Sequence, residues 1–330
     1  MKNIYWILFI VIFITAGCQD MNSDDGNSSS IIYNNESQYV DENNENETIV
    51  AKITQTPTPE PEPVLYRPER VIIPDIQYVP DGIPKQQLDL FLPIAENENQ
   101  VFPIIMMIHQ GNSDKRQMSS LAINFADQGF AIISIDHREE PKYQFPANVE
   151  DAVCALGWIY SNADDYGFDV ENIYLLGYSS GGTISAFLGT HDDLGSFAGN
   201  CPSALPEEFK IAGVIVYTGI FDYTSFAGGD PALEDYITEL LGSDHESDPE
   251  LWIKSSPISW VDGSEPEFLL LHGENDGIIL PSQSTLFAET LSNIGVGVEV
   301  HIIPGIDHMS LISSGEALNI LTQFLLEKTK

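Results

Sequence analysis

A serine in a sharp turn is the strongest candidate for chemistry in this chain. Ser179 stands in the pentapeptide Gly177-Tyr178-Ser179-Ser180-Gly181, which follows an apolar run and precedes a segment with helical spacing. A Gly-x-Ser-x-Gly turn between a strand and a helix lifts the serine hydroxyl clear of the sheet, where a base can remove its proton. The two glycines leave room for the crowded backbone of such a turn. We therefore predict that Ser179 is a nucleophile.

The base that serves this serine must be one of the seven histidines in the chain. After such a turn the usual order along the chain is nucleophile, acid and then histidine, with the histidine on a loop after the last strand. Only His301 and His308 lie far enough along. His301 falls inside a predicted strand, which favours a structural role, whereas His308 follows that strand on a glycine-containing loop. We predict that His308 is the base.

The third member of the site should be a carboxylate that orients the imidazole and stabilises its charged form. The apolar run that ends at Leu271 is followed by a loop with two acidic residues, Glu274 and Asp276. Asp276 lies further into the loop, and Glu274 is expected to be solvated. Asp307 adjoins the predicted base in sequence, which places it poorly to accept the Nδ1 proton. We predict that Asp276 is the acid.

An oxyanion hole requires backbone N–H groups near the nucleophile. The amide of Ser180 should be one donor, because it follows the nucleophile at the start of a helix. The second donor should come from the loop after the apolar run 102–108, where the amides of Gln110, Gly111 and Asn112 are alternatives. His109, at the start of this loop, is expected to be a structural hydrogen bonder.

The elements that must position these residues alternate along the chain. Uninterrupted apolar runs are typical of central strands buried on both faces of a parallel sheet, and they alternate here with segments of helical spacing. The first two strands lack an intervening helix and should form an antiparallel edge. The sequence predicts a doubly wound α/β fold with about eight strands, at residues 70–78, 87–92, 102–108, 130–136, 172–177, 211–218, 267–271 and 298–303, and with helices at 115–128, 147–162, 180–190, 281–294 and 310–327.

One long segment, about 219–266, interrupts this alternation. It contains four prolines, a short predicted helix at 232–241 and six aromatic residues. An insertion at the carboxyl edge of a sheet commonly covers the site there. Most of its aromatic residues should pack the insertion onto the body of the domain. We predict a small cap that shapes the substrate site.

The N-terminal segment carries the features of an export signal. Lys2 and an apolar run precede Thr15-Ala16-Gly17-Cys18, and this tetrapeptide resembles the lipobox of bacterial lipoproteins. The resemblance implies that residues 1–17 are removed and that Cys18 carries a lipid; the alternative is a plain secretory signal. Residues 18–63 are polar, acidic and finally proline-rich, which predicts a disordered tether that holds the domain of residues 64–330 near a membrane. The expected location is the bacterial cell surface or the periplasm.

The overall charge is strongly acidic, with a net value of −37. The tether holds ten acidic residues and one lysine, so the domain itself carries 40 acidic against 11 basic residues. Such a balance argues against binding of nucleic acid, because phosphate backbones require basic surfaces. A solubilising surface is sufficient to explain this charge.

Two cysteines, Cys154 and Cys201, remain in the predicted domain. An even pair in a compartment that permits disulfides predicts that the two residues are bonded. The alternative is a pair of buried thiols, since the sequence does not show that the two residues are near each other.

Seven short motifs follow one another along the chain: residues 88–93, the loop 109–111, residues 134–138, residues 145–151, the turn 177–182, residues 272–276 and the pair 307–308. This ordered set resembles bacterial α/β-hydrolase carboxylesterases related to dienelactone hydrolase and the prolyl oligopeptidase catalytic domain. The resemblance covers nearly all of residues 64–330. It implies a triad of Ser179, Asp276 and His308, which matches the choice made from the residues themselves. One departure concerns the oxyanion loop, where many such esterases have His-Gly-Gly-Gly but this chain has Gln110 and Asn112 beside Gly111.

The expected function is hydrolysis of carboxylic esters outside the cytoplasm through an acyl-enzyme intermediate. Such chemistry requires no metal and no organic cofactor. The expected partners are a small-molecule ester and, through Cys18, a membrane; the sequence does not predict an oligomeric state. The alternatives are a serine peptidase of the prolyl oligopeptidase type and a hydrolase-fold binding protein without turnover.

Overall fold

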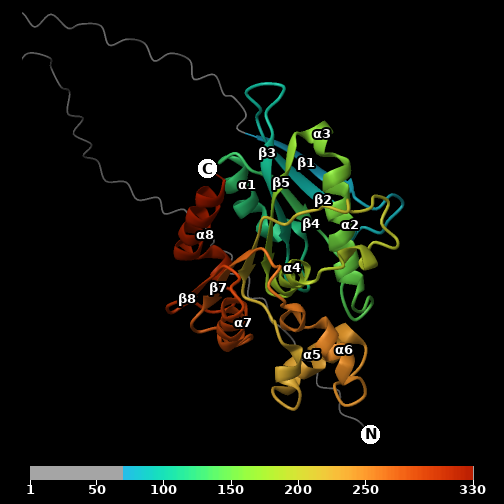
Figure 1. Cartoon of the computed structure of the whole chain (residues 1–330), viewed down its shortest axis with the longest axis vertical. Helices are drawn as coiled ribbons and strands as arrows, with labels where there is room; N and C mark the ends of the chain where they lie inside the picture. The colour runs from blue at the N-terminus through green and yellow to red at the C-terminus, as the bar shows by residue number, and fades with distance from the viewer. Residues whose placement is uncertain (1–69, 330) are drawn as a thin grey trace, which may run out of the picture. The chain divides into compact units, whose positions relative to one another are not determined.

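The computed structural model describes residues 70–329, and the statements below concern these residues. The predicted signal segment 1–17, the tether 18–63 and Cys18 lie outside them. The centre of the domain is an eight-stranded sheet with the order β1-β2-β4-β3-β5-β6-β7-β8 (Figure 1). Its strands are β1 (Arg70–Gln77), β2 (Gln87–Pro93), β3 (Phe102–Ile108), β4 (Ala131–Ile135), β5 (Phe168–Tyr178), β6 (Gly213–Tyr217), β7 (Glu267–Gly273) and β8 (Val298–Ile303).

The strand directions confirm the predicted α/β-hydrolase fold and refine its edge. β2 pairs antiparallel with both β1 and β4, whereas the pairs from β4 through β3, β5, β6 and β7 to β8 are all parallel. Only β2 is therefore reversed among these eight strands, and β1 runs in the same direction as the other strands. The expectation of an antiparallel edge formed by the first two strands is confirmed, because their short connection reverses the chain without a crossover helix.

Helices cover both faces of the sheet (Figure 1). Alternate residues of β3 explain why its sequence is uniformly apolar. Ile104, Met106 and Ile108 belong to the core cluster that contains residues of the helices at 147–161, 180–190 and 282–293, whereas Ile105 and Met107 belong to the cluster that contains residues of the helices at 119–126 and 315–328. The helices are α1 (Ser119–Ala126), α2 (Ala147–Ser161), α3 (Ala163–Tyr166), α4 (Ser180–Thr190), α7 (Ser282–Asn293) and α8 (Gly315–Lys328), with the 3-10 helices η1 (Lys115–Met118), η2 (Leu194–Phe197) and η5 (Leu311–Ser313).

The insertion at 219–266, here called the cap, has more helical structure than its sequence suggested. It contains η3 (Tyr223–Phe226), α5 (Pro231–Leu241), α6 (Pro249–Ser255) and η4 (Pro257–Trp260). Figure 1 shows α5 and α6 beyond one end of the sheet, apart from the helices that cover its faces. Trp252 of α6 is fully buried in an apolar cluster made largely of cap residues. The cap therefore has a small core of its own.

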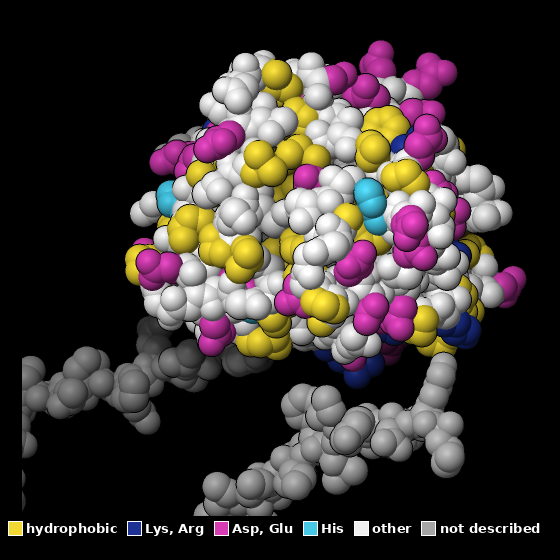
Figure 2. Space-filling view, turned by 90° about the horizontal axis from the view of Figure 1, so that it is seen from below, with side chains coloured by type: hydrophobic (Ala, Val, Ile, Leu, Met, Phe, Trp, Pro, Cys, Tyr) yellow, Lys and Arg dark blue, Asp and Glu magenta, His cyan; other side chains and the backbone are white. Residues whose placement is uncertain are grey.

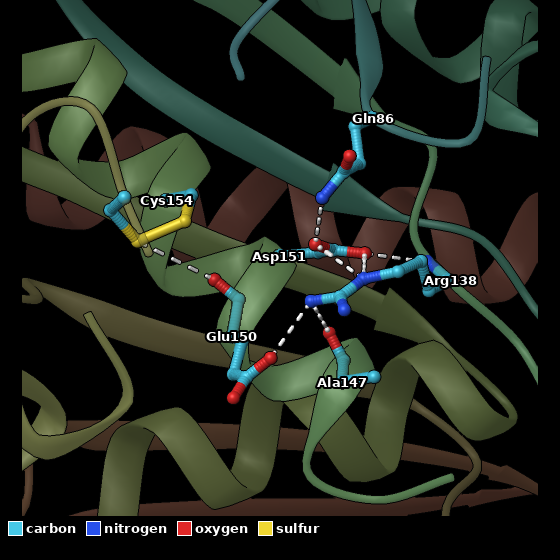
Figure 3. Close-up of a disulfide and its surroundings, with 7 residues drawn as sticks. Gln86, Arg138, Ala147, Glu150, Asp151 and Cys154 are labelled. Atoms are coloured by element: carbon cyan, nitrogen blue, oxygen red, sulfur yellow. Dashed lines mark hydrogen bonds and ion pairs between the residues drawn. A yellow bond between two sulfur atoms is a disulfide. The ribbon is translucent and has the colours of Figure 1, made fainter. Parts of the chain in front are cut away.

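A disulfide joins Cys154 of α2 to Cys201 on the loop that follows η2 (Figure 3). The two Cα atoms are 4.9 Å apart, and 47 positions separate the residues in the sequence. On the same helix Asp151 and Glu150 bind the guanidinium of Arg138, whose Nε lies 2.9 Å from Asp151 Oδ2. The disulfide and this ion-paired cluster together fix α2 against the loops around it.

None of the helices in residues 70–329 combines the length and the apolar character that are needed to cross a membrane.

Candidate functional site

The predicted nucleophile lies on a strained turn between β5 and α4. Ser179 has φ 57° and ψ −119°, a conformation that non-glycine residues rarely adopt. A Cβ atom at Gly177 would overlap the carbonyl oxygen of Gly181, and one at Gly181 would overlap the carbonyl oxygen of Ile108. Both glycines are therefore required by close backbone approach, as the sequence indicated.

The structure brings Ser179, His308 and Asp276 together from three loops at the carboxyl ends of β5, β8 and β7. The Nε2 atom of His308 lies 3.0 Å from Ser179 Oγ, and its Nδ1 atom lies 2.7 Å from Asp276 Oδ2. His308 and Asp276 are both buried. This arrangement allows proton transfer from the serine to the imidazole and stabilisation of the resulting imidazolium by the carboxylate.

The carboxylate of Asp276 is saturated with hydrogen-bond donors. Burial alone would raise its pKa, but the hydrogen bonds and charges around it outweigh that effect and hold the pKa well below its usual range. The backbone amides of Ile278 and Ile279 donate to Oδ1, each over 2.9 Å, and the hydroxyl of Thr218 donates to Oδ2 over 3.0 Å. Asp276 therefore stays ionised and fixed in orientation.

Two buried residues next to Asp276 were not singled out from the sequence. Thr218 follows β6, and His272 lies in β7 with its Nε2 atom 2.8 Å from the carbonyl oxygen of Ile279 and its Nδ1 atom 2.7 Å from Ser284 Oγ. These contacts assign the Nε2–H tautomer to His272, with the serine hydroxyl donating to Nδ1. One signal was available in the sequence, since Thr218 ends a predicted strand at the edge of the sheet that carries the site.

Tyr178, the variable residue before the nucleophile, anchors the loop of the predicted base. Its hydroxyl donates to the backbone carbonyl oxygen of His308 over 2.8 Å. Burial raises the pKa of Tyr178 to about 12, so the phenol stays protonated and remains a donor at neutral pH. Tyr178 could not be singled out from the sequence, because any residue can occupy its position in the motif.

The alternatives weighed from the sequence have other contacts. His301 lies on β8 with Nε2 3.4 Å from Glu299 Oε2, and Glu274 accepts the amide N–H of Gly305 over 2.9 Å. Asp307 accepts an amide N–H within its own turn over 2.8 Å. Within the described part of the chain, none of these three side chains hydrogen-bonds to Ser179.

Two of the three amides expected to supply the second oxyanion donor are already engaged. The Gln110 amide donates to Gln117 Oε1 over 3.1 Å, and the Asn112 amide donates to Glu139 Oε1 over 2.8 Å. The structure therefore corrects the expectation for Gln110, whose N–H is held by a side chain seven positions along. Gly111 is left as the candidate on this loop.

Gly111 and Ser180 lie side by side next to Ser179. A Cβ atom placed on Gly111 would be 3.5 Å from Ser180 Oγ. Ser180 is the first residue of α4, so its amide has no acceptor within the helix. Among residues 70–329 no hydrogen-bond acceptor is found for the amide of Gly111. These two N–H groups are available to a developing oxyanion.

His109, as expected, has a structural position behind this loop. Its ring stacks on that of His137 with the centroids 4.3 Å apart, and its Nδ1 atom lies 2.6 Å from the carbonyl oxygen of Gln110. Burial, reinforced by His137, lowers the pKa of His109 to about 2. The ring is therefore neutral at physiological pH, and its Nδ1–H donates to the loop backbone.

A cavity of about 270 Å³ opens above Ser179. The cap contributes Ile220, Tyr223, Leu233 and Tyr236 to its wall. Burial raises the pKa of both tyrosines, which stay neutral. The remaining lining residues come from the loops that carry the site and from the start of α4: Gln110, Gly111, Asn112, Ser179, Ser180, Thr183, Ile278, Ile279, His308 and Met309.

Metal-binding side chains were also sought among residues 70–329. No three His, Cys, Asp or Glu side chains in that range are grouped so that they could hold a metal ion.

Sequence comparison finds named esterases. Esterase LipQ of Mycobacterium tuberculosis (strain ATCC 25618 / H37Rv) is 28% identical over 231 residues, which are 67% of this chain and 53% of that protein. Esterase LipC of the same organism is 28% identical over 189 residues, which are 56% of this chain and 46% of that protein. The chain thus spans about half the length of these curated relatives.

Solved structures agree with the fold. A structure described as a truncated form of a carbohydrate esterase from gut microbiota aligns with a TM-score of 0.68 at 25% identity, over 79% of this chain and 97% of that one. Esterase B from Lactobacillus rhamnosis aligns with a TM-score of 0.67 at 19% identity, over 79% of this chain and 85% of that one, which shows a shared fold.

One family model matches the chain over residues 88–291. The matched range contains Ser179 and Asp276 and ends before His308. Because the match covers more than half of the 330 residues, the chain belongs to the family described as BD-FAE, whose fold here is that of the α/β-hydrolases.

Proposed function

We propose that this protein is a serine carboxylic-ester hydrolase whose triad is Ser179, His308 and Asp276. The observation that carries the proposal is the unbroken line of contacts, 3.0 Å from Ser179 Oγ to His308 Nε2 and 2.7 Å from His308 Nδ1 to Asp276 Oδ2. The named esterases among the relatives support the same reaction class.

The first half of the reaction forms an acyl-enzyme. His308 Nε2 takes the proton of Ser179 as Oγ attacks the ester carbonyl carbon, and Asp276 stabilises the imidazolium. The amides of Ser180 and Gly111 donate to the oxyanion of the tetrahedral intermediate. As that intermediate collapses, the C–O bond to the alcohol breaks, and His308 delivers its proton to the leaving oxygen.

The second half releases the acid. His308 removes a proton from a water molecule, whose oxygen attacks the acyl carbon through the same oxyanion site. The bond to Ser179 Oγ then breaks, and the proton returns from His308 to the serine. The balance is one ester and one water converted to one alcohol and one acid.

A test uses Ser179→Ala with Ser120→Ala as a matched control on the exposed side of α1. Hydrolysis of p-nitrophenyl acetate and labelling by a fluorophosphonate should be lost in the first variant and retained in the second. Retained hydrolysis in Ser179→Ala would overturn the proposal. Hydrolysis of aminoacyl p-nitroanilides in place of esters would favour the serine peptidase alternative, and failure of wild-type labelling would favour a binding protein.

We also propose that the protein acts outside the cytoplasm, anchored through a lipid on Cys18. The signal-like segment before Cys18 and the acidic tether after it support this location, and so does the disulfide of Cys154 and Cys201, since disulfides persist in oxidising compartments. Labelling with a radioactive fatty acid should mark the wild type and not Cys18→Ala. Equal labelling of the two would contradict the anchor.

A further inference from the structure

The proposed reaction dictates where the two halves of an ester lie, and the inference below rests on that proposed function. The carbonyl oxygen must point to the amides of Ser180 and Gly111. The leaving oxygen must lie next to His308 Nε2, because that atom delivers its proton. The alcohol therefore leaves along the His308 side of the cavity, and the acyl group occupies the space that remains.

The His308 side of the cavity is apolar and open. Met309 follows the predicted base directly, and Ile278 lies on the loop of Asp276; both line the cavity. Met309 is 57% exposed and Ile278 is 49% exposed, so both side chains are half outside the protein. These two large apolar side chains stand at the entrance of the cavity. They are removed from contact with water only when an apolar surface covers them.

The domain that carries this rim is acidic. Figure 2 views the domain from the side on which α5 and α6 lie in Figure 1, and it shows hydrophobic side chains exposed between many acidic ones. Asp307 is close in sequence to Met309, and its pKa is lowered by hydrogen bonds from Ser310, so it stays charged. A neutral group with an apolar face suits such a rim better than an anionic group does.

Another part of the cavity wall is closed. Thr183, Ile220 and Tyr223 line it and are all buried. The hydroxyl of Thr183 accepts the amide N–H of Ile220 over 2.9 Å, which fixes this wall to α4. A wall built from buried side chains limits the size of the acyl group, because a larger acyl group would displace residues of the packed core.

We propose that Ile278 and Met309 form a leaving-group subsite for alcohols with an apolar face, such as an alkyl chain or a benzyl ring. The buried wall restricts the acyl group to short acids. The two side chains act on the alcohol alone, since the tetrahedral geometry at the carbonyl carbon separates the leaving oxygen from the acyl carbon.

The test compares two ester series on each variant. Ethyl, hexyl and benzyl acetates vary the alcohol at a constant acyl group, and ethyl acetate, butyrate and hexanoate vary the acyl group at a constant alcohol. In the wild type kcat/KM should rise along the first series. In Met309→Ser and Ile278→Ser the preference for benzyl over ethyl acetate should fall about tenfold, while the ratio of ethyl acetate to ethyl butyrate stays within about twofold.

Two control variants distinguish the loss of a direct contact with the alcohol from a general disturbance of the fold. Val101→Ser changes a side chain that is 56% exposed and lies just before β3, at the amino end of that strand and not at the carboxyl end where the site lies. It should leave both series unchanged. Met309→Leu keeps an apolar side chain and should retain the benzyl preference. Thermal unfolding of each variant shows whether the fold is intact.

The outcomes separate this inference from the proposed function. If Ser179→Ala still hydrolyses esters, both proposals fail. If that activity is lost as expected but Met309→Ser and Ile278→Ser keep the benzyl preference, or change the acyl series instead, the leaving-group subsite alone is overturned.

Discussion

The hydroxyl of Thr218 lies 3.0 Å from Oδ2 of Asp276, the same oxygen that lies 2.7 Å from His308 Nδ1. The hydroxyl donates to the carboxylate, while Oδ1 accepts two backbone amides. All of these donors favour the ionised form and one orientation of the carboxylate plane. The orientation of the imidazole at Ser179 therefore depends on a residue that directly follows β6 and does not contact Ser179.

Thr218→Val tests this dependence, because valine has the same shape as threonine and lacks the hydroxyl. Loss of a buried hydrogen bond to a charged group should lower kcat about 10- to 100-fold with little change in KM. Thr218 has φ 52°, and both side chains are branched at Cβ, so the backbone strain is matched. Kinetics on a short ester check this prediction. Thr218→Ser keeps the hydroxyl and should retain most of kcat; an equal loss in both variants would contradict the role given to the hydrogen bond.

The order of the three site residues along the chain was predictable from the sequence. The side-chain contacts that support these residues were not. Ser179, Asp276 and His308 follow strands that were recognisable as apolar runs, so their shared edge of the sheet could be predicted. Thr218 and His272 contact each other across 54 positions, and such a pairing depends on side-chain geometry in the folded core. The same limit explains Gln110, whose amide is taken by the side chain of Gln117 rather than left free.

In the fold, too, some elements could be predicted from the sequence and others could not. Apolar runs without interruption predicted the strands that are buried on both faces, such as β3, which has the predicted bounds. β8 also has the predicted bounds, although Glu299 and His301 interrupt its apolar residues. Helix α6 in the cap was not predicted, although Asp248 and Pro249 form a helix start in which the aspartate accepts the amide N–H of Leu251. A helix of seven residues is too short to show a periodic pattern. Its apolar residues are explained by the cap core.

Gly181→Ala tests the close approach of α4 to β3. A Cβ atom at this position would overlap the carbonyl oxygens of Ile108 and His109, so the loop that starts at His109 and the turn at Ser179 would be pushed apart. We expect the free energy of unfolding to fall by about 3 kcal/mol and ester hydrolysis to fall with it. Urea unfolding and kinetics measure both effects.

The matched control for that change is Gly315→Ala at the start of α8, where a Cβ atom meets no atom within 4 Å. This substitution should leave activity unchanged and stabilise the fold by about 0.5 kcal/mol. Equal effects of the two substitutions would show that the contact with β3 is not the cause.

Removal of the disulfide should destabilise the domain without changing the site directly. The crosslink between Cys154 and Cys201 closes a loop with a separation of 47 positions. The chain-entropy model assigns about 4 kcal/mol of stability to a loop of that length. The double variant Cys154→Ser with Cys201→Ser should lose about this amount in urea unfolding, and dithiothreitol should weaken the wild type to a similar degree. If dithiothreitol also weakens the double variant, the disulfide is not the source of the loss.

Acid should weaken the fold through His109. Burial lowers the pKa of His109 to about 2 in the native state, whereas an unfolded chain has a histidine pKa of about 6.5. Between these two values the unfolded chain binds the additional proton, so the contribution of His109 to stability is complete above about pH 6.5 and falls as the pH is lowered. From about pH 7 to about pH 5 the loss from this residue should be about 2 kcal/mol.

His109→Phe isolates this contribution, because phenylalanine keeps a flat ring against His137 and cannot bind a proton. The variant loses the donor to the carbonyl oxygen of Gln110 and should be less stable than the wild type at about pH 8 by about 1 kcal/mol. Its further loss between about pH 7 and about pH 5 should be smaller than that of the wild type by about 2 kcal/mol, so the two stability curves cross and the variant is the more stable protein at about pH 5, by about 1 kcal/mol. Urea unfolding at several pH values measures both curves. Parallel curves for the two proteins would mean that His109 is not buried in its neutral form, since only a difference in proton binding between the folded and unfolded states changes the slope.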